Sequence, residues 1–194
     1  MSKSIDFYFD FISPYSYLAY QKIKILKKNK KIFFNFKPIF LGGLHNLQGI
    51  TAPAFIKSKL SHMINDCILI AKKNNIDFAW NSKFPINSLD LMRGYILIDA
   101  NLKDIYLDTI FNAYWKYNLD ISNKEILKSL LIKCKINTDT FFENIKELEI
   151  KDALRNITKE AHEKEVFGAP TFTVNDKIFW GQDRLDFALE EYNK

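Results

Sequence analysis

Cysteine and histidine are scarce in this sequence, and their positions exclude two common kinds of site. The 194 residues contain two cysteines, Cys67 and Cys134, which lie far apart and belong to no paired motif. The three histidines have no metal-ligand spacing, so a structural zinc site has no support. Two isolated cysteines are typical of a reducing compartment, and we expect a cytoplasmic protein.

Long apolar runs and arginine clusters are also lacking. No segment approaches membrane-spanning length, and residues 1–6 lack the apolar region of a secretory signal, so we expect no membrane association. The net charge of +5 comes largely from lysines on predicted helices, most densely at residues 24–31. A solvated helix end explains that group, and without a basic–aromatic array we expect no nucleic-acid partner.

Aromatic residues, by contrast, are abundant. Hydrophobic residues make up 47% of the chain and aromatic residues 15%, with 17 phenylalanines, which excludes a disordered chain and predicts an aromatic-rich core. The length suits one well-buried domain or a domain with a large insertion. The sequence has no repeat and no linker rich in proline, glycine or serine, which favours a single folded unit over residues 1–194.

The N-terminal stretch is the most informative part of the chain. Phe7, Phe9 and Phe11 occupy alternate positions, as in a strand with a buried face. Ser13 and Pro14 follow, and serine is a good N-cap whereas proline is favoured at the first helical position. A strand end, a hydroxyl and a helix N-terminus would meet here, which suits an anion. We interpret this place as a site that holds a thiolate.

The regular elements on either side of this stretch predict one strand–helix–strand unit. A strand is expected near residues 4–11, a helix over 14–28 and a second strand over 32–38. Short links between them predict parallel neighbouring strands with a right-handed crossover. Residues 39–53, which contain a glycine pair, are expected to be the least regular part of the chain.

The middle of the chain predicts helices, and its end predicts a return to strands. Helices are expected over residues 54–74, from 87 or 88, over 103–117, over 122–132 after a capping box at Ser122 and Glu125, over 138–148 and over 151–165. A strand over 166–174, a turn at 175–177, a return strand from 178 and a helix from 182 or 183 complete the chain. We therefore expect a base of residues 1–53 and 149–194 with a helical insertion over 54–148.

The serine motif resembles a known family. Ser13 and Ser16 stand where thioredoxin-fold redox enzymes carry Cys-x-x-Cys, and the stretch from Phe7 to Ser16 resembles the 2-hydroxychromene-2-carboxylate isomerases. These are glutathione-dependent proteins related to the kappa-class glutathione transferases. The resemblance implies an α/β fold: a thioredoxin-like fold with a large all-helical insertion between its βαβ and ββα halves. It also implies a homodimer and a small aromatic carboxylate substrate.

For Ser13 the resemblance implies a catalytic role, against the simpler one of an N-cap. Serine cannot exchange disulfides, so the thiol has to come from glutathione. Lowering a thiol pKa of about 8.5 by about two units requires roughly 2.7 kcal/mol. A charge-assisted hydrogen bond from Ser13 together with a helix N-terminus can supply that much. Ser16 is an early helical residue that supports the turn, and we assign it no catalytic role.

A second segment, Gly168-Ala169-Pro170-Thr171, lies far along the chain. In thioredoxin-like folds a proline just before a core strand is typically cis and faces the nucleophile. The resemblance implies that the Ala169 backbone pairs with the cysteinyl part of glutathione and that Pro170 lies beside the sulfur.

Further residues are implied for glutathione with less support from the sequence itself. Gln182 and Asp183 lie in a segment similar to the family's Trp-Gly-Asn-Asp-Arg-Leu, which holds the γ-glutamyl end; Asp183 could equally be an ordinary cap beside Arg184. Lys59 corresponds to a lysine that meets the glycyl carboxylate, or it is a solvated helix lysine. Pro14 and Tyr15, next to Ser13, complete the implied set.

The chain departs from the family pattern after Gly49. Relatives carry asparagine next, whereas this chain has Ile50, and Asn46 or Gln48 are the amides that could replace it. Aromatic segments around Phe84 and Trp115 could wall a pocket for a flat substrate or pack in the core.

The activity that the resemblance implies is isomerisation between a cyclic chromene carboxylate and trans-o-hydroxybenzylidenepyruvate. Two alternatives remain: a kappa-like glutathione transferase or peroxidase, which would consume glutathione, and a thiol-binding module without turnover. A disulfide oxidoreductase is nearly excluded, because the motif has no sulfur.

Overall fold

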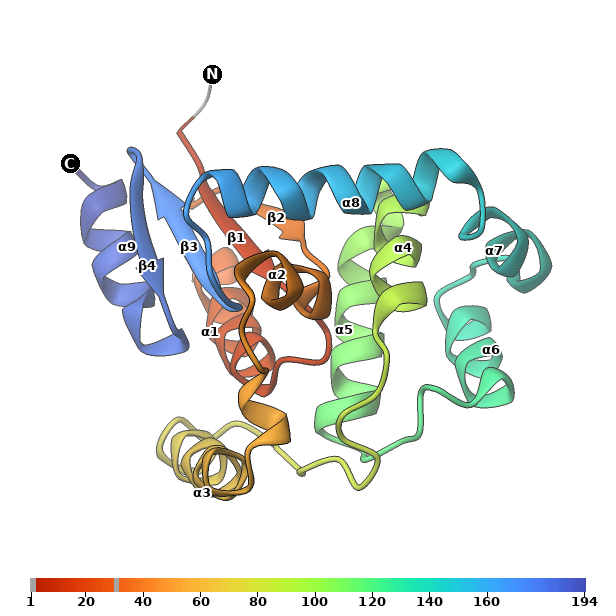
Figure 1. Ribbon diagram of the computed structural model, residues 1–194, viewed down its shortest axis with the longest axis horizontal. Helices are drawn as coiled ribbons and strands as arrows, with labels where there is room; N and C mark the ends of the chain where they lie inside the picture. The colour runs from red at the N-terminus through yellow and green to blue at the C-terminus, as the bar shows by residue number, and fades with distance from the viewer. Residues whose placement is uncertain (1–2, 30–31) are drawn as a thin grey trace.

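The computed structural model describes residues 3–29 and 32–194, and a four-stranded mixed sheet lies at one end of the molecule (Figure 1). The strands are β1 (Ile5–Phe9), β2 (Phe34–Pro38), β3 (Thr171–Val174) and β4 (Lys177–Trp180). Their spatial order is β2-β1-β3-β4, with β1 parallel to β2 and the other two pairs antiparallel. The parallel pair predicted from the strand–helix–strand unit is confirmed. Part of the predicted lysine group, Lys30 and Lys31, lies outside the described residues.

Helices cover the sheet and form the rest of the molecule (Figure 1). They are α1 (Pro14–Asn29), α2 (Leu41–Gln48), α3 (Lys57–Lys73), α4 (Leu89–Leu97), α5 (Lys103–Trp115), α6 (Lys124–Lys133), α7 (Thr138–Asn144), α8 (Leu148–Glu163) and α9 (Leu185–Tyr192), with short 3₁₀ turns η1 (Pro53–Phe55), η2 (Ala100–Leu102) and η3 (Gln182–Arg184). Among the described residues, no helix is both long and apolar enough to cross a membrane.

The two faces of the sheet bury different side chains because residues alternate along a strand. Phe7 and Phe9 of β1 point into the larger core, where Phe9 contacts Phe111 of α5 with ring centroids 5.9 Å apart. Tyr8, between them, points to the opposite face and packs in a smaller cluster with Leu44 of α2 and Ala161 of α8. The sheet is therefore enclosed between two unlike helical layers.

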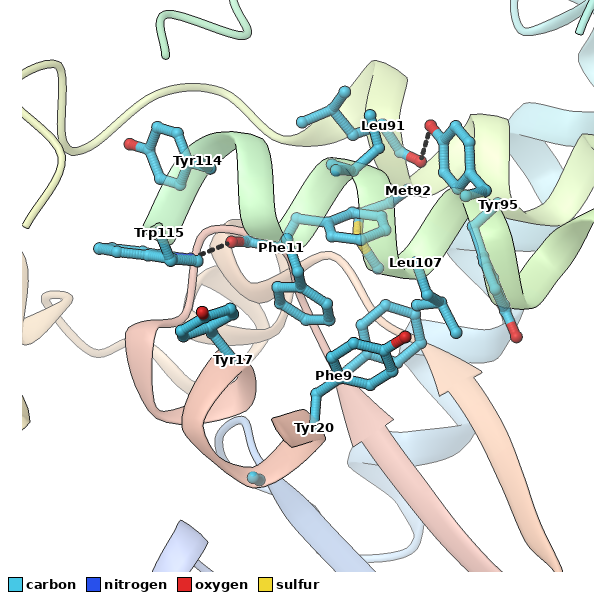
Figure 2. Close-up of a cluster of buried hydrophobic side chains, with 14 of the residues drawn as sticks. Phe9, Phe11, Tyr17, Tyr20, Leu91, Met92, Tyr95, Leu107, Tyr114 and Trp115 are labelled. Carbon is cyan, nitrogen blue, oxygen red and sulfur yellow. Dashed lines mark hydrogen bonds between the residues drawn. The ribbon is translucent and has the colours of Figure 1, made fainter. Parts of the chain in front are cut away.

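The larger core joins the sheet to the helical region through aromatic rings (Figure 2). Phe11 stacks edge-on against Phe111 with centroids 4.8 Å apart, and its carbonyl accepts a hydrogen bond from Trp115 Nε1 at 2.8 Å. Trp115 and Tyr114 are fully buried, so both residues pack in the core and do not line an open pocket. Each fully buried aromatic side chain contributes about 1.5–3 kcal/mol. Contacts with α5 therefore hold Phe11, in the segment between β1 and α1, in place.

Helix α2 contradicts the prediction that residues 39–53 are the least regular. The glycine pair Gly42 and Gly43 predicts a loop, and glycine also has low helix propensity, yet both residues lie in α2. Tertiary contacts override this preference: Leu44 is buried between the sheet and α8, and the Asp10 carboxylate accepts a hydrogen bond from the amide of Leu41. The helix ends at Gly49, whose φ of 66° favours glycine.

The predicted capping box at Ser122 is wrong by one residue. Asn123 is the N-cap of α6, and its side chain accepts hydrogen bonds from the amides of Glu125 and Ile126. The Ser122 hydroxyl instead donates to Asp120. Serine and asparagine cap about equally well, so two adjacent cap residues could not be ranked from the sequence.

Candidate functional site

Ser13 lies between the end of β1 and the start of α1, and it is almost fully buried. Its Oγ accepts a hydrogen bond from the amide of Ser16 at 3.1 Å, which is the N-cap interaction that the sequence predicts. The same Oγ donates to the carbonyl of Ala169 at 2.8 Å. One hydroxyl therefore links the first helix to a segment 156 positions later in the chain.

The start of α1 favours a negative charge near this hydroxyl. The first turn of α1 contains no acidic residue, whereas Lys27 and Lys28 lie in its last turn. The partial positive charge at the helix N-terminus is therefore not offset by a carboxylate in that turn. An anion that approaches Ser13 meets a hydroxyl donor and the positive end of the helix dipole.

The segment that faces Ser13 contains the second predicted motif. The peptide bond between Ala169 and Pro170 is cis, as the resemblance implies. Thr171 Oγ1 donates to the Gly168 carbonyl at 2.7 Å, and the Pro170 carbonyl accepts from the amide of Gly181 at 2.9 Å. The structure thus brings Ser13, Ala169 and Pro170 together and connects them directly to the turn before η3.

Asp10 is a buried carboxylate immediately behind the Ser13 turn. Its Oδ1 accepts from the amide of Ile12 at 3.1 Å and its Oδ2 from the amide of Leu41 at 2.8 Å, while its carbonyl accepts from the amide of Ser13 at 3.0 Å. Burial raises the pKa of Asp10 from 3.8 to about 6, although its hydrogen bonds, including one with Ser88, oppose the rise. Asp10 therefore holds the Ser13 turn and the first residue of α2 in a fixed relation.

Pro14 and Tyr15 have different environments although they are neighbours. Pro14 is buried at the first position of α1. Tyr15 is half-buried, and its hydroxyl donates to Asp66 of α3 at 2.7 Å. Burial and the adjacent Asp66 raise the pKa of Tyr15. Tyr15 thus connects α1 to α3, and this contact could not be predicted because no pattern near Tyr15 or Asp66 specifies the other residue.

The Gln182 side chain forms a hydrogen bond within the protein and is not exposed at the surface. It is buried, and its Oε1 accepts a hydrogen bond from Lys22 Nζ of α1 at 2.8 Å. Burial lowers the pKa of Lys22. Asp183 is exposed and pairs with Arg184 at 2.9 Å, which is the ordinary surface arrangement considered for it above. The link between Lys22 and Gln182 could not be found from sequence, because their positions are 160 apart.

Lys59 and the segment near Ile50 lie at the surface. Lys59 is exposed in the first turn of α3, and no hydrogen bond connects it to Ser13 or Ala169 within residues 3–29 and 32–194. Ile50 is exposed just after Gly49. Of the two amides that could replace the missing asparagine, Asn46 is exposed, whereas Gln48 donates to the carbonyl of Val166 at 3.3 Å. Gln48 is therefore the amide that faces the segment leading to Ala169.

Comparison with known proteins gives a consistent result over nearly the whole chain. The model of the DsbA-like thioredoxin domain matches residues 4–193. The 2-hydroxychromene-2-carboxylate isomerase of Pseudomonas putida is 30% identical over 96% of this chain and 92% of its own length, and that of Sphingobium xenophagum is 28% identical over 99% and 98%. Glutathione S-transferase kappa 2 of Caenorhabditis elegans is 27% identical over 98% and 93%.

A solved structure extends the likeness to three dimensions. The structure of a 2-hydroxychromene-2-carboxylate isomerase superposes with a TM-score of 0.87 at 27% identity, and the match covers 96% of this chain and 92% of that chain. The fold predicted from the serine motif, a thioredoxin-like α/β fold with a helical insertion, is confirmed by the family match and by this neighbour.

Proposed function

Because the chain belongs to the DsbA-like thioredoxin family and, within it, to the family of 2-hydroxychromene-2-carboxylate isomerases, we propose that it is a glutathione-dependent isomerase. The reaction would interconvert 2-hydroxychromene-2-carboxylate and trans-o-hydroxybenzylidenepyruvate. The observation that carries the proposal is the position of the Ser13 hydroxyl, 2.8 Å from the Ala169 carbonyl and at the N-terminus of α1.

The residues around Ser13 fit a bound thiol peptide. A hydroxyl donor, a helix N-terminus without an acidic first turn, and a backbone segment that can pair with an extended peptide lie in one place. Bound glutathione would supply a thiolate that adds reversibly to the conjugated substrate, allows a carbon–carbon bond to rotate after the ring has opened, and leaves unchanged. Ser13 would hold the negative charge of the sulfur throughout.

The energetics of Ser13 involve an exchange of hydrogen bonds. Its single proton now bonds to the neutral Ala169 carbonyl, a type of bond with a net contribution of about 0.5–1.5 kcal/mol. To stabilise a thiolate, the hydroxyl has to rotate toward the sulfur and form a charge-assisted bond of about 1.5–3 kcal/mol. The gain is the difference between the two, so Ser13 alone falls short of the roughly 2.7 kcal/mol needed for a two-unit pKa shift. The helix N-terminus has to supply the remainder.

Calorimetric titration with glutathione over a pH series tests this proposal directly. We expect the native protein to bind glutathione and release a proton near neutral pH, because the bound form is the thiolate. Ser13→Ala should bind more weakly and release little or no proton. No binding by the native protein at millimolar glutathione would overturn the proposed use of this thiol.

A second candidate function is a kappa-like glutathione transferase, which the 27% identity to the Caenorhabditis elegans protein favours. The two activities differ in the fate of the thiol. An isomerase leaves the glutathione concentration constant during turnover, whereas a transferase consumes one molecule for each product. Measuring free thiol while the substrate is converted distinguishes them.

We further propose that the protein acts in the cytoplasm as a homodimer on a small aromatic carboxylate. Cys67 and Cys134 are both free and buried, which is compatible with a reducing compartment. Ile68 and Leu69 are exposed large apolar side chains on α3, and burial between two subunits would remove them from water. Sedimentation equilibrium over a range of concentrations tests the dimer, and a mass of 22.8 kDa at all concentrations would contradict it.

A further inference from the structure

A hollow of about 210 Å³ is lined by residues of β1, β2, α4, α5 and α8. Figure 1 shows α8 running past β2 to α4. The hollow lies partly on the face of the sheet toward which Tyr8 points. The lining comes from two strands and three helices, and apart from the amide of Asn35 its side chains are aromatic, aliphatic or charged. Ser13, Ala169 and Pro170 are not among the lining residues.

The inner part of the hollow is apolar and aromatic. Tyr95 of α4 is almost fully buried and Ala161 of α8 fully so, while Phe36 and Ile157 are half-buried. Lys103 Nζ lies 5.0 Å from the centre of the Tyr95 ring, which is within the range of a cation–π contact. A hydrocarbon ring in the hollow would therefore meet the half-buried Phe36 and Ile157 and the small exposed part of Tyr95, with a cation beside it.

The charged part of the hollow is mostly basic and lacks internal partners. Lys37 and Lys103 are half-buried, and neither forms an ion pair with any carboxylate in the described part of the chain. Half-buried lysines elsewhere in the described chain differ in this respect: Lys24 pairs with Asp108 and Lys116 with Asp77, whereas Lys151 of α8 forms no ion pair either. An anion between two such cations would be attracted to both of them.

Two further charges flank this pair. Lys164, just beyond the end of α8, is exposed and adds a third positive charge, while Glu160 is the acidic residue in the lining. Three cations against one carboxylate leave the hollow positive. Lysine ammonium groups act as point charges rather than as the planar fork of arginine, so they suit a single carboxylate group at the rim.

We propose that this hollow binds a small aromatic monocarboxylate, with its ring against Tyr95 and its carboxylate between Lys37 and Lys103. The volume favours a ligand of about one ring, because pockets for drug-sized molecules measure about 300–1,000 Å³. The site is additional to the thiol site and does not depend on the proposed isomerase activity.

Titration of the full-length protein with benzoate, followed by amide chemical shifts in NMR spectra, tests the site. We expect saturable shifts at Lys37, Tyr95 and Lys103 in the native protein. Lys37→Met combined with Lys103→Met should weaken benzoate binding by about tenfold or more, because two charge-assisted contacts are lost. Shifts confined to the surroundings of Ser13 would overturn the proposal.

Matched controls separate this site from general attraction of anions. Lys151→Met removes a half-buried lysine of α8 that does not line the hollow, so benzoate binding should be unchanged. Ser13→Ala should likewise bind benzoate normally, and loss of binding in that variant would overturn the proposal. Benzyl alcohol and inorganic phosphate should each bind about tenfold more weakly than benzoate, since each lacks half of the recognised chemistry. Equal binding of phosphate would reduce the site to unspecific charge attraction and contradict the proposal.

Discussion

The residues around the proposed glutathione site fall into two groups with opposite environments. The inner group, Ser13, Ala169 and Pro170, is largely buried and joined by hydrogen bonds to Asp10 and to the turn before η3. The outer group, Ile50, Lys59 and Asp183, is exposed and has few contacts with the rest of the protein. The difference indicates two roles: the fold fixes the group that would hold the sulfur, whereas exposed surface side chains would adjust affinity for the ends of the peptide.

The largest expected effect comes from removing the inner hydroxyl. Ser13→Ala should lower kcat/KM for 2-hydroxychromene-2-carboxylate by about 100-fold or more, as is typical when one donor to a developing anion is lost. Ser16→Ala is the matched control, because its buried hydroxyl has no hydrogen-bond partner in the described chain. Steady-state kinetics at saturating glutathione measure both. Equal losses in the two variants would mean that the turn, and not the Ser13 hydroxyl, matters.

The second prediction concerns Asp10, the buried carboxylate whose backbone is hydrogen-bonded to Ser13. Because the pKa of Asp10 is raised in the folded state to about 6 from 3.8, the folded protein binds this proton more tightly than the unfolded chain. Its contribution should therefore destabilise the protein as the pH rises from about 4 to 6, by about 3 kcal/mol in total. Asp10→Asn should remove this pH dependence. Urea unfolding at several pH values measures it.

A surface carboxylate provides the control for that experiment. Asp139 is exposed in the first turn of α7, and Asp139→Asn should leave the pH dependence between 4 and 6 nearly unchanged. If Asp10→Asn and Asp139→Asn give the same curve as the native protein, the raised pKa of Asp10 is wrong.

A smaller effect is expected in the outer group at Ile50. Ile50→Asn restores the amide that relatives carry and exposes no core residue, because Ile50 is already exposed. One additional hydrogen bond to a bound peptide should tighten glutathione binding by about threefold to tenfold. Calorimetry measures the change. Gln48→Ala tests whether the neighbouring amide has taken over this role, in which case Ile50→Asn should have no effect until Gln48 is removed.

The smallest effect is expected at Lys59. An exposed ion pair contributes about 0–1 kcal/mol, so Lys59→Ala should weaken glutathione binding by no more than about fivefold. The loss should shrink further at high salt, because exposed charges are screened. Lys57→Ala, in the same turn of α3, serves as control. A large loss that does not depend on salt would mean that Lys59 is buried by the ligand and belongs with the inner group.

The Ser13 turn could be predicted from the sequence because its signal is local: a serine before a proline after an aromatic strand predicts an N-cap. The cis bond before Pro170 was implied by the family resemblance alone, because most X–Pro bonds are trans. Helix α2 could not be predicted, because its glycines disfavour a helix and its stability depends on Asp10 and α8. The bond from Lys22 to Gln182 was also unpredictable, since nothing in either segment specifies the other. Interactions between residues close in sequence could be predicted, whereas contacts between distant segments could not.

The pairing of β1 with both ends of the chain has a consequence for biosynthesis. During translation β1 and β2 emerge early, but β3, which covers the other edge of β1, is made more than 160 residues later. Because translation proceeds at about 5–20 residues per second, β1 is without β3 for roughly ten to thirty seconds after its own synthesis. Throughout that interval Ser13 has no Ala169 carbonyl beside it. A ribosome-bound nascent chain therefore lacks part of its native sheet, and Phe7 and Phe9 lack part of the core that buries them in the folded protein.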